Sequence, residues 1–366
     1  KFLKAEKTLV LDKKKLTIKM TSQDEKPIIS LLNSFSAPVL VEFNQPINDL
    51  FTIMEYETDY PSIWLAKKKL DYIALEKIAS NSSDRESIIE RIVQILIKKV
   101  KKKGLLSKLL QLPDDHEYFS KLLENNNTAD PNIIKQNLSI YYNLYKKYFK
   151  EFSVSYFKSF IDRELYQRKY SDHEDRALAC ALIFLNRDTS FLDNSFDVIF
   201  NNSDNMSLMI SCLINFISNT DRNKNINKFY LKYGHDKILL NKWFSTQVQY
   251  SSPKMAIDRL HKLTNHKDFK MLNPNNFNSL IGTFAKRNFQ SFHQKDGSGY
   301  KIIAEWIKKI DPANPQIAAS TTKAFAQIRF LPPPYRENAK KALEIIPYGQ
   351  KLSKDTSEIL DKIKTF

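Results

Sequence analysis

The sequence predicts a mainly α-helical protein, an irregular superhelical array of antiparallel helices preceded by a short β segment. The first observation behind this prediction is the scarcity of glycine, 6 of 366 residues, against an average of about 7%. So little glycine disfavours turn-rich β folds and glycine-rich phosphate loops. The second is a recurring helix-start signal, a capping side chain followed by proline, found at Asp130-Pro131, Ser252-Pro253, Asn273-Pro274 and Asn314-Pro315.

The length of the chain predicts an extended arrangement rather than one compact globule. Its 366 residues exceed the roughly 250–300 at which a single hydrophobic core stops growing. We expect about fifteen helices of ordinary length joined by short linkers. Short antiparallel helices without a sheet between them stack pair on pair and produce a curved array with a concave face. Because no motif returns at a fixed period, the array should be irregular.

The first part of the chain has a different pattern, which predicts β-strands. Residues 8–11 (TLVL) and 16–20 (LTIKM) are short apolar runs that suit a hairpin, and residues 38–43 (PVLVEF) alternate in the same way. Three strands are too few to bury both faces of a sheet. We therefore predict that residues 1–45 are the C-terminal part of an incomplete β-sandwich domain and that residues 46–366 form an all-helical C-terminal domain.

The formal net charge of +16 raises the question of a nucleic-acid partner, since clustered Lys and Arg bind phosphates. The densest basic run, residues 98–103 (KKVKKK), ends an apolar helical pattern, where cations complement the helix dipole. Residues 141–150 interleave aromatics with lysines, but the aromatics recur three or four apart, as on a buried helix face. Neither pattern favours nucleic acid. No apolar run approaches the roughly 18 residues of a membrane span, so no membrane partner is expected.

No arrangement of residues in the sequence predicts catalysis or a metal site. His173-Glu174 is a pair of the kind found in zinc proteases, but the second histidine of such a site would stand where Ala177 is. Asp258 and His261 share a helix face without a third ligand nearby, which is typical of a surface pair. We therefore expect no catalytic residue and no cofactor in this chain.

Several short motifs resemble the C-terminal helical domain of one enzyme family. The most specific stretch begins at Asn273-Pro274-Asn275 and runs to Gly282. The other matching segments, in the order of that family, are Phe35-Ser36-Ala37-Pro38, Asp172-His173-Glu174-Asp175, Asn241-Lys242-Trp243-Phe244, Phe292-His293, Asp296-Gly297-Ser298-Gly299-Tyr300 and Asn314-Pro315-Gln316-Ile317-Ala318. In these motifs the chain resembles the M1 family of zinc aminopeptidases, of the aminopeptidase N type.

The resemblance implies a fold, partners and an activity for a longer parent enzyme. In this family a β-sandwich precedes a helical domain that folds over a thermolysin-like catalytic domain and encloses its zinc site. The chain would then be a non-catalytic C-terminal fragment of a metalloprotease that removes N-terminal residues from peptides, and it would wall and cap the substrate chamber. Its partners would be the parent's N-terminal and catalytic domains and a peptide. Zinc would belong to the parent, because the family's H-E-x-x-H and G-A-M-E-N motifs do not occur here.

The resemblance also singles out positions on the chamber wall. Similar bacterial enzymes carry arginines there, two in the helix after Asn-Pro-Asn and one in the helix after Asn-Pro-Gln. In this chain Asn276, Asn278 and Ser320 stand at those positions, so a peptide carboxylate would lack its bidentate partners. Gln316 matches the family pattern, and we expect it either to contact the substrate channel or to serve as a capping or surface group.

Two other interpretations remain open. One is a stand-alone helical scaffold that binds protein or RNA, which should show an unbroken apolar or basic patch on its concave face. The other is a fragment of a catalytically inactive paralogue, which the altered arginine positions suggest. The sequence upstream of Lys1 distinguishes these interpretations from an active aminopeptidase, because an active parent needs both the H-E-x-x-H and the G-A-M-E-N motif. Under each interpretation Cys180 and Cys212 fit free thiols of a reducing compartment, so a cytoplasmic location is expected.

Overall fold

The computed structural model describes residues 7–18, 27–39, 41–99, 102–124, 128–166, 172–218, 223–347 and 352–364. The α-helices of the first half are α1 (Ile47–Tyr56), α2 (Tyr60–Ala79), α3 (Arg85–Lys98), α4 (Lys103–Leu109), α5 (Asp115–Leu123), α6 (Pro131–Ile161), α7 (His173–Leu185), α8 (Asp193–Asn202) and α9 (Met206–Ser218). Those of the second half are α10 (Asn223–Tyr233), α11 (Lys237–Gln249), α12 (Pro253–Thr264), α13 (Pro274–Phe277), α14 (Thr283–Arg287), α15 (Phe289–Phe292), α16 (Ser298–Ile310), α17 (Pro315–Thr322), α18 (Pro333–Leu343) and α19 (Lys354–Lys364). Short 3-10 or π-helical turns are η1 (Asn33–Phe35), η2 (Asp162–Tyr166), η4 (Asn278–Gly282) and η5 (Lys323–Phe330).

Three of the four predicted helix starts are capped by the predicted side chain, whereas Ser252 makes no capping hydrogen bond. Asp130, Asn273 and Asn314 each accept a hydrogen bond from a backbone N–H of the first turn, at 2.8, 3.0 and 3.1 Å, and open α6, α13 and α17. Proline follows each of them at the first helical position, where its missing N–H costs nothing. Helix α12 also begins at a proline, Pro253.

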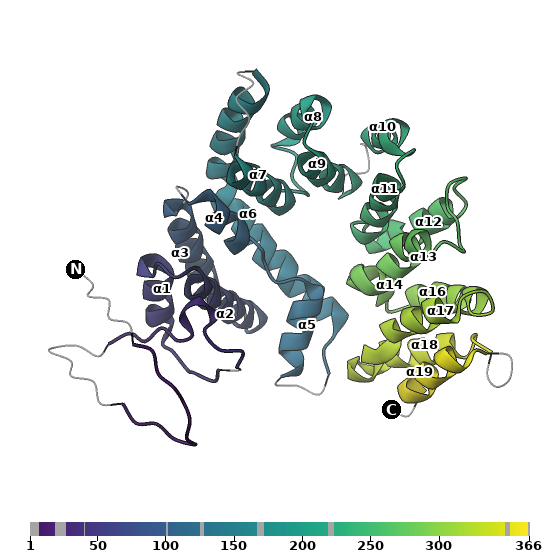
Figure 1. Ribbon diagram of the computed structural model, residues 1–366, viewed down its shortest axis with the longest axis horizontal. Helices are drawn as coiled ribbons and strands as arrows, with labels where there is room; N and C mark the ends of the chain where they lie inside the picture. The colour runs from purple at the N-terminus through teal and green to yellow at the C-terminus, as the bar shows by residue number, and fades with distance from the viewer. Residues whose placement is uncertain are drawn as a thin grey trace.

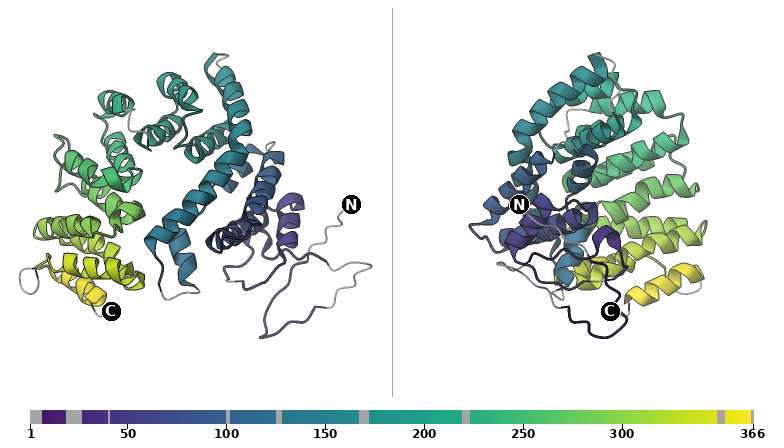
Figure 2. Two further views of the ribbon diagram at one scale, coloured as in Figure 1. Left: turned by 180° about the vertical axis from the view of Figure 1, so that it is seen from behind. Right: turned by 60° about the vertical axis from the view of Figure 1, so that its left-hand side comes forward.

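The helices stack as an irregular, curved array, as predicted. Some helices pack on the next helix in sequence, such as α1 on α2, α2 on α3, α9 on α10, α10 on α11 and α16 on α17. Others pack on a helix further along the chain: α3 on α6, α4 on α7, α7 on α9 and α17 on α19. Figure 1 shows the resulting arc, and the right-hand view of Figure 2 shows the helices of the second half lying in roughly parallel rows. The buried apolar side chains form one connected cluster from Leu50 in α1 to Ile363 in α19.

The arc closes on itself where α5 and the start of α6 meet α15, η5 and α18. The amide of Gln290 donates to the Asp115 carboxylate at 2.5 Å, and the Phe289 ring lies 5.0 Å from that of His116 and 5.5 Å from that of Phe119. A second set of bonds joins the α5–α6 connection to η5 and α18: Ala129 N donates to Phe330 O at 2.9 Å and Tyr335 Oη to Asp130 Oδ1 at 3.1 Å. We call this set of contacts the seam.

The strands predicted within residues 1–45 are not formed in the part that the structure describes, whereas the assignment of this segment to a β-sandwich domain stays a prediction. No strand occurs within residues 7–18, 27–39 and 41–45, and residues 19–20 of the expected hairpin lie outside the described ranges. Figure 1 shows this segment running outside the helical array. The physical reason is that a strand needs a neighbouring strand for its N–H and C=O groups. Without one the apolar side chains stay in solvent, and Val10 is 78% exposed.

The two basic stretches of the sequence serve the fold, as predicted. The aromatic side chains of Tyr141, Tyr145 and Phe149 are fully buried on one face of α6. Lys98 and Lys103 pair with acidic side chains of α1 and α7, with Nζ–O distances of 3.4 and 3.0 Å. Among the described residues, these contacts engage Lys98, Lys103 and the aromatic rings within the fold.

Candidate functional site

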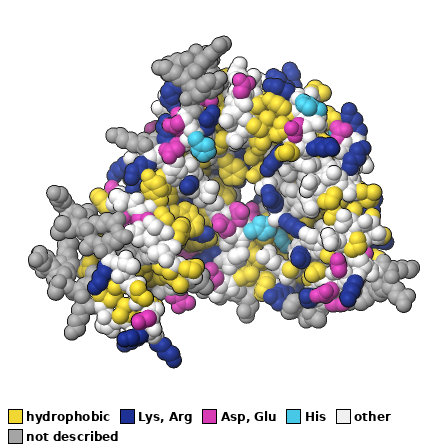
Figure 3. All heavy atoms as spheres, viewed as in Figure 1, with side chains coloured by type: hydrophobic (Ala, Val, Ile, Leu, Met, Phe, Trp, Pro, Cys, Tyr) yellow, Lys and Arg dark blue, Asp and Glu magenta, His cyan; other side chains and the backbone are white. Residues whose placement is uncertain are grey.

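The concave side of the array encloses a cavity of about 1110 Å³. Its lining comes from α4 to α7 on one side and from α9, the α11–α12 connection and the α14–α15 connection on the other. Figure 3 shows the surface hollowed near the middle of the molecule, with basic and acidic side chains at its border. The charged lining residues are Lys108, Lys135, Lys146, Arg176, Arg187 and Arg287, against Asp114, Asp115 and Asp188. Six cations face three carboxylates, so the cavity has a surplus of positive charge.

Arg187 projects from the end of α7 and is held from several sides. Its guanidinium lies over the rings of Phe184 and Tyr142, 4.4 and 5.4 Å from their centroids, and Nη1 donates to Phe184 O at 3.1 Å. Its carbonyl accepts a hydrogen bond of 2.7 Å from Asn215 of α9. The buried Asn186 beside it donates to Leu182 O at 2.8 Å, which fixes the end of α7. The arginine is thus placed by backbone and ring contacts, with the Asp188 carboxylate 3.8 Å from its Nε.

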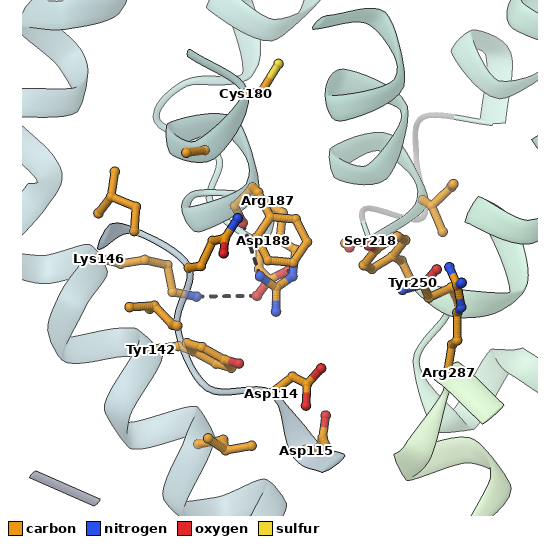
Figure 4. Close-up of a pocket in the computed structure, with 18 of the residues that line it drawn as sticks. Asp114, Asp115, Tyr142, Lys146, Cys180, Arg187, Asp188, Ser218, Tyr250 and Arg287 are labelled. Carbon is orange, nitrogen blue, oxygen red and sulfur yellow. Dashed lines mark hydrogen bonds and ion pairs between the residues drawn. The ribbon is translucent and has the colours of Figure 1, made fainter. Parts of the chain in front are cut away.

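Arg287 and Tyr250 lie on the opposite wall (Figure 4). Arg287 is the last residue of α14, and the buried Asn288 that follows it donates to Val248 O at 2.7 Å and to Ser251 O at 3.0 Å. These bonds tie the end of α14 to the α11–α12 connection. Burial raises the pKa of Tyr250, and the charges of Arg187 and Arg287 oppose that rise. The positive charges of both arginines therefore reach the Tyr250 hydroxyl. Because burial still raises its pKa, the hydroxyl stays protonated and can donate a hydrogen bond.

The acidic residues of the cavity all have partners. Asp114 caps α5 by accepting from Glu117 N at 2.9 Å, and Asp188 pairs with Lys146 at 3.3 Å. Asp115 accepts from Gln290 at 2.5 Å; burial raises the pKa of this carboxyl, and that hydrogen bond opposes the rise. Asp114 keeps its charge in this arrangement and acts on the Tyr250 phenol together with the two arginines.

The described residues offer no metal site and no activated nucleophile in the cavity. Nowhere in those ranges do three His, Cys, Asp or Glu side chains meet as a ligand set, so the residues at hand do not fit zinc. His173 is the first residue of α7, which Asp172 caps. Cys180 lines the cavity, but burial raises the pKa of its thiol, which keeps it in the less nucleophilic protonated form.

The four positions singled out in the sequence do not line this cavity. Asn276 is buried, and its side chain links neighbouring parts of the fold. Its Nδ2 donates to Asn241 Oδ1 at 2.8 Å, and its Oδ1 accepts from Lys270 N at 2.6 Å. Asn278 is exposed at the start of η4, and Gln316 is exposed in the first turn of α17.

Ser320 accepts a hydrogen bond of 3.0 Å from the Lys286 ammonium, so a cation does reach this position from α14. Sequence reasoning missed Lys286, Arg187 and Arg287. The only local signal for the two arginines is an asparagine beside each at a helix end, which is too common to identify a site.

The curved stack of antiparallel helices around a cavity defines a class of fold, the ARM-repeat arrays. The chain belongs to the family described as "Domain of unknown function (DUF3458_C) ARM repeats", whose sequence model matches residues 47–365. None of the described helices is both long and apolar enough to cross a bilayer.

Curated relatives place the chain beside the C-terminal part of aminopeptidase N. It is 25% identical to aminopeptidase N of Caulobacter vibrioides over 369 residues, covering 97% of this chain and 41% of the relative. It is 24% identical to aminopeptidase N of Haemophilus influenzae and 25% identical to that of Escherichia coli, covering 92% of this chain and 39% of each. The chain spans about 40% of the length of these relatives. It is thus homologous to the C-terminal region of aminopeptidase N, as predicted.

A solved structure has the same fold. Legionella pneumophila aminopeptidase A, crystallised in complex with aspartic acid, matches with a TM-score of 0.76 and 24% identity, over 93% of this chain and 41% of that one. This likeness supports the helical array as the fold of the chain. The complete array, from α1 to α19, falls within the family match.

Proposed function

We propose that this chain is the non-catalytic wall and cap of the substrate chamber of an M1 zinc aminopeptidase whose complete form removes N-terminal residues from peptides. The observation that carries the proposal is the closed helical array around a cavity of about 1110 Å³ in a chain homologous to the end of aminopeptidase N. In this proposal the zinc site lies in residues outside this chain. The location would be cytoplasmic, which suits the free thiols of Cys180 and Cys212.

The size and rigidity of the cavity suit an extended peptide. Pockets for drug-sized ligands have volumes of about 300–1,000 Å³, so a cavity of about 1110 Å³ has room for several residues but not for a folded protein. Its lining is fixed by buried asparagines at two helix ends, Asn186 and Asn288. A wall with fixed polar groups orients a substrate by holding its far end while a reactive end is placed elsewhere.

Residues 1–45 are the proposed contact with the rest of the parent, as the end of a β-sandwich domain. Their apolar side chains, including Leu9, Val10, Leu11 and Val39, are 46%, 78%, 70% and 56% exposed. Exposed apolar side chains in such density are typical of a surface that another part of the protein covers. A stand-alone RNA-binding scaffold is less favoured, because carboxylates lie among the cations of the concave face.

The test begins with the sequence that precedes Lys1 in the intact gene product. We expect H-E-x-x-H, a downstream Glu and G-A-M-E-N there, and an intact protein that releases amino acids from peptides. An upstream sequence without a zinc-protease motif would refute the aminopeptidase proposal. A motif that lacks a ligand His or the general-base Glu, together with no peptidase activity, would identify the inactive paralogue instead.

A further inference from the structure

One edge of the helical array, away from the cavity, combines exposed aliphatic side chains with lysines. Connections of a few residues join α10 to α11 and α11 to α12, so neighbouring helices run in opposite directions. The end of α10, the start of α11, the end of α12 and the connection to α13 therefore lie at the same edge, and Figure 2 shows these rows of helices in its right-hand view. We call residues 228–242 and 261–273 the lysine edge. None of them lines the cavity.

Side-chain contacts fix the parts of the lysine edge to one another. Tyr230 of α10 donates from Oη to Asp268 Oδ2 at 2.5 Å, and its ring lies 4.9 Å from that of His266. Trp243 of α11 donates through Nε1 to Ile226 O at 3.0 Å, and its ring lies 5.4 Å from that of His266. Helix α10, helix α11 and the connection after α12 thus present one continuous surface.

Three aliphatic side chains project from this surface. Leu231, Ile238 and Leu272 are 81%, 72% and 63% exposed. Beyond residue 41 they are the three most exposed large apolar side chains of the part that the structure describes. A single exposed leucine is ordinary on a protein surface. The gathering of all three at one edge, from three different segments, is what calls for a function.

The same edge has a surplus of positive charge. Residues 223–275 contain ten Lys and Arg against three Asp and no Glu, so they contribute seven of the net charge of +16. The lysines that are exposed at the ends of the helices and in the connection to α13 are Lys232, Lys237, Lys262, Lys267 and Lys270. They surround the three aliphatic side chains along the chain.

The acids near these lysines do not cancel the surplus. Asp236 caps α11 by accepting from two backbone N–H groups of its first turn, at 2.8 and 3.0 Å, and Asp268 accepts from the tyrosine hydroxyl of α10. The pKa of Lys232 is raised by its contact with Tyr233 and, to a smaller extent, by the charge of Asp204 in the α8–α9 connection. Lys232 therefore stays charged, and five lysines meet three carboxylates.

We propose that the lysine edge is a docking surface for an anionic lipid membrane. In such a contact, aliphatic side chains enter the boundary between headgroups and acyl chains, while the ammonium groups stay among the lipid phosphates. The cytoplasmic leaflet of membranes carries anionic lipids that attract lysines. The contact is peripheral and needs no spanning helix, so it is compatible with the lack of a long apolar run in the sequence. It also does not depend on the proposed peptide chamber.

The composition of the lysine edge favours lipid over the other anionic partners. Interfaces between proteins are depleted of lysine and enriched in aromatic side chains and arginine, whereas this edge exposes lysine, leucine and isoleucine. Single-stranded nucleic acid stacks its bases on aromatic rings, and aliphatic side chains offer no such platform. A second copy of the chain would bring the same net charge of +16 and be repelled.

The test measures co-sedimentation of the 366-residue chain with lipid vesicles. One set of vesicles contains phosphatidylcholine alone, and the other contains phosphatidylcholine mixed with phosphatidylglycerol. The chain should bind the anionic vesicles at least about tenfold more tightly, since each lysine near an anionic surface contributes about fivefold. The preference should shrink as salt is raised, because the Debye length falls from about 30 Å at 0.01 M to about 8 Å at 0.15 M.

Variants then assign the binding to the lysine edge. The double variant Leu231→Ser, Ile238→Ser should bind anionic vesicles about tenfold more weakly, because it removes the side chains that enter the lipid. Lys237→Gln and Lys262→Gln should each weaken binding about fivefold. All four side chains are exposed, so the variants should fold normally.

Two matched controls lie on α6. Ile133 is 51% exposed and Lys158 is exposed. Ile133→Ser removes an equally apolar side chain, and Lys158→Gln removes the same charge from the chain, so both should bind the anionic vesicles like the native protein. A general effect of net charge would instead weaken Lys158→Gln as much as the lysine-edge variants.

Three results would overturn the proposal. The first is equal binding, or none, to the two kinds of vesicle. The second is anionic binding that survives in all lysine-edge variants, which would assign it to another segment such as residues 7–18, where lysines and aliphatic side chains are also exposed. The third is a double variant that binds vesicles normally while the lysine variants lose vesicles and single-stranded oligouridine alike, which would make the edge a general polyanion site.

Discussion

At the scale of single residues, Asp175 joins three elements of the array. Its carboxylate is 4% exposed and accepts hydrogen bonds from Tyr156 Oη of α6 at 2.7 Å and Arg163 Nη2 of η2 at 2.8 Å, and it pairs with Lys103 Nζ of α4 at 3.0 Å. Burial alone would raise the pKa of Asp175, but these three partners outweigh burial, so the pKa lies below its usual value. The ionised form is therefore part of the folded structure.

Replacing this carboxylate should lower stability in a pH-dependent way. We expect Asp175→Asn to reduce the free energy of unfolding by about 2 kcal/mol at pH 7, because it leaves hydrogen-bonded cations without their acceptor. A lowered pKa stabilises the fold above the unfolded value of 3.8 and loses that contribution as the pH falls through the folded pKa. Urea titrations at pH 7 and below pH 4 should give a large and then a small difference from the native chain. Asp258→Asn, an exposed site on α12, is the control.

His293 is a second buried titratable residue, and the folded structure holds it in the neutral form. Burial lowers the pKa of His293 from 6.5 to about 3, and its Nδ1 lies 2.9 Å from Tyr300 Oη. Between these two pH values the unfolded chain binds a proton that the folded chain does not, so the free energy of unfolding falls as the pH falls through that window. The imidazole signals of His293 in NMR spectra should stay constant from about pH 5 to 8. A titration midpoint near 6.5 would contradict the buried neutral form.

At the scale of elements, one buried carboxylate holds the start of α19, which packs on α17. Asp311, which follows α16, is 2% exposed; its Oδ1 accepts from Ser353 Oγ and Thr356 Oγ1, both at 2.5 Å, and its Oδ2 accepts from Ser353 N at 2.9 Å. These bonds satisfy donors at the start of α19, while Leu360 and Ile363 bury its apolar side. The C-terminal helix thus depends on a residue outside its own sequence.

Asp311→Ala should loosen α19 without disturbing the rest of the molecule. Loss of an acceptor for three donors costs about 1–3 kcal/mol, while the packing of α19 on α17 remains. Hydrogen exchange should become faster in residues 354–364 and stay unchanged in α6. Equal acceleration in both helices would mean that Asp311 supports the whole array rather than its last element.

Sequence predicted those elements whose signals are local. Asp130-Pro131 opens α6 because capping needs only adjacent residues, and Tyr145 is buried because the spacing of aromatics places it on one face. Residues 8–11 have the composition of a strand but form none, because a strand requires a partner that composition does not supply. The facing of Arg187 and Arg287 depends on the curvature of the array, which brings together residues one hundred positions apart in sequence.

At the scale of the whole molecule, the seam decides whether the array is an open arc or a closed ring. Phe289 is 2% exposed and packs against His116 and Phe119 across the seam. We expect Phe289→Ala to cost about 3–5 kcal/mol, as for other buried aromatics, and to let the ring open. Small-angle scattering should then report a larger radius of gyration.

The control for the seam is an equally buried aromatic away from it. Phe229 of α10 is 1% exposed, so Phe229→Ala should cost a similar free energy of unfolding. It should leave the radius of gyration of the folded protein unchanged, because the contacts across the seam remain. If the two variants expand equally, the seam does not hold the ring closed.

Ring closure also changes how the chain should fold and respond to a cut. Helical repeat arrays usually contact only their neighbours, so they unfold in pieces and separate when the backbone is cleaved. Here the bond between Asp130 and Tyr335 joins residues 205 positions apart. Such a contact must form late, after the intervening helices have stacked, and it ties α6 through α18 into one cooperative unit. A single backbone cut between α9 and α10 would therefore leave two fragments that stay associated and melt together.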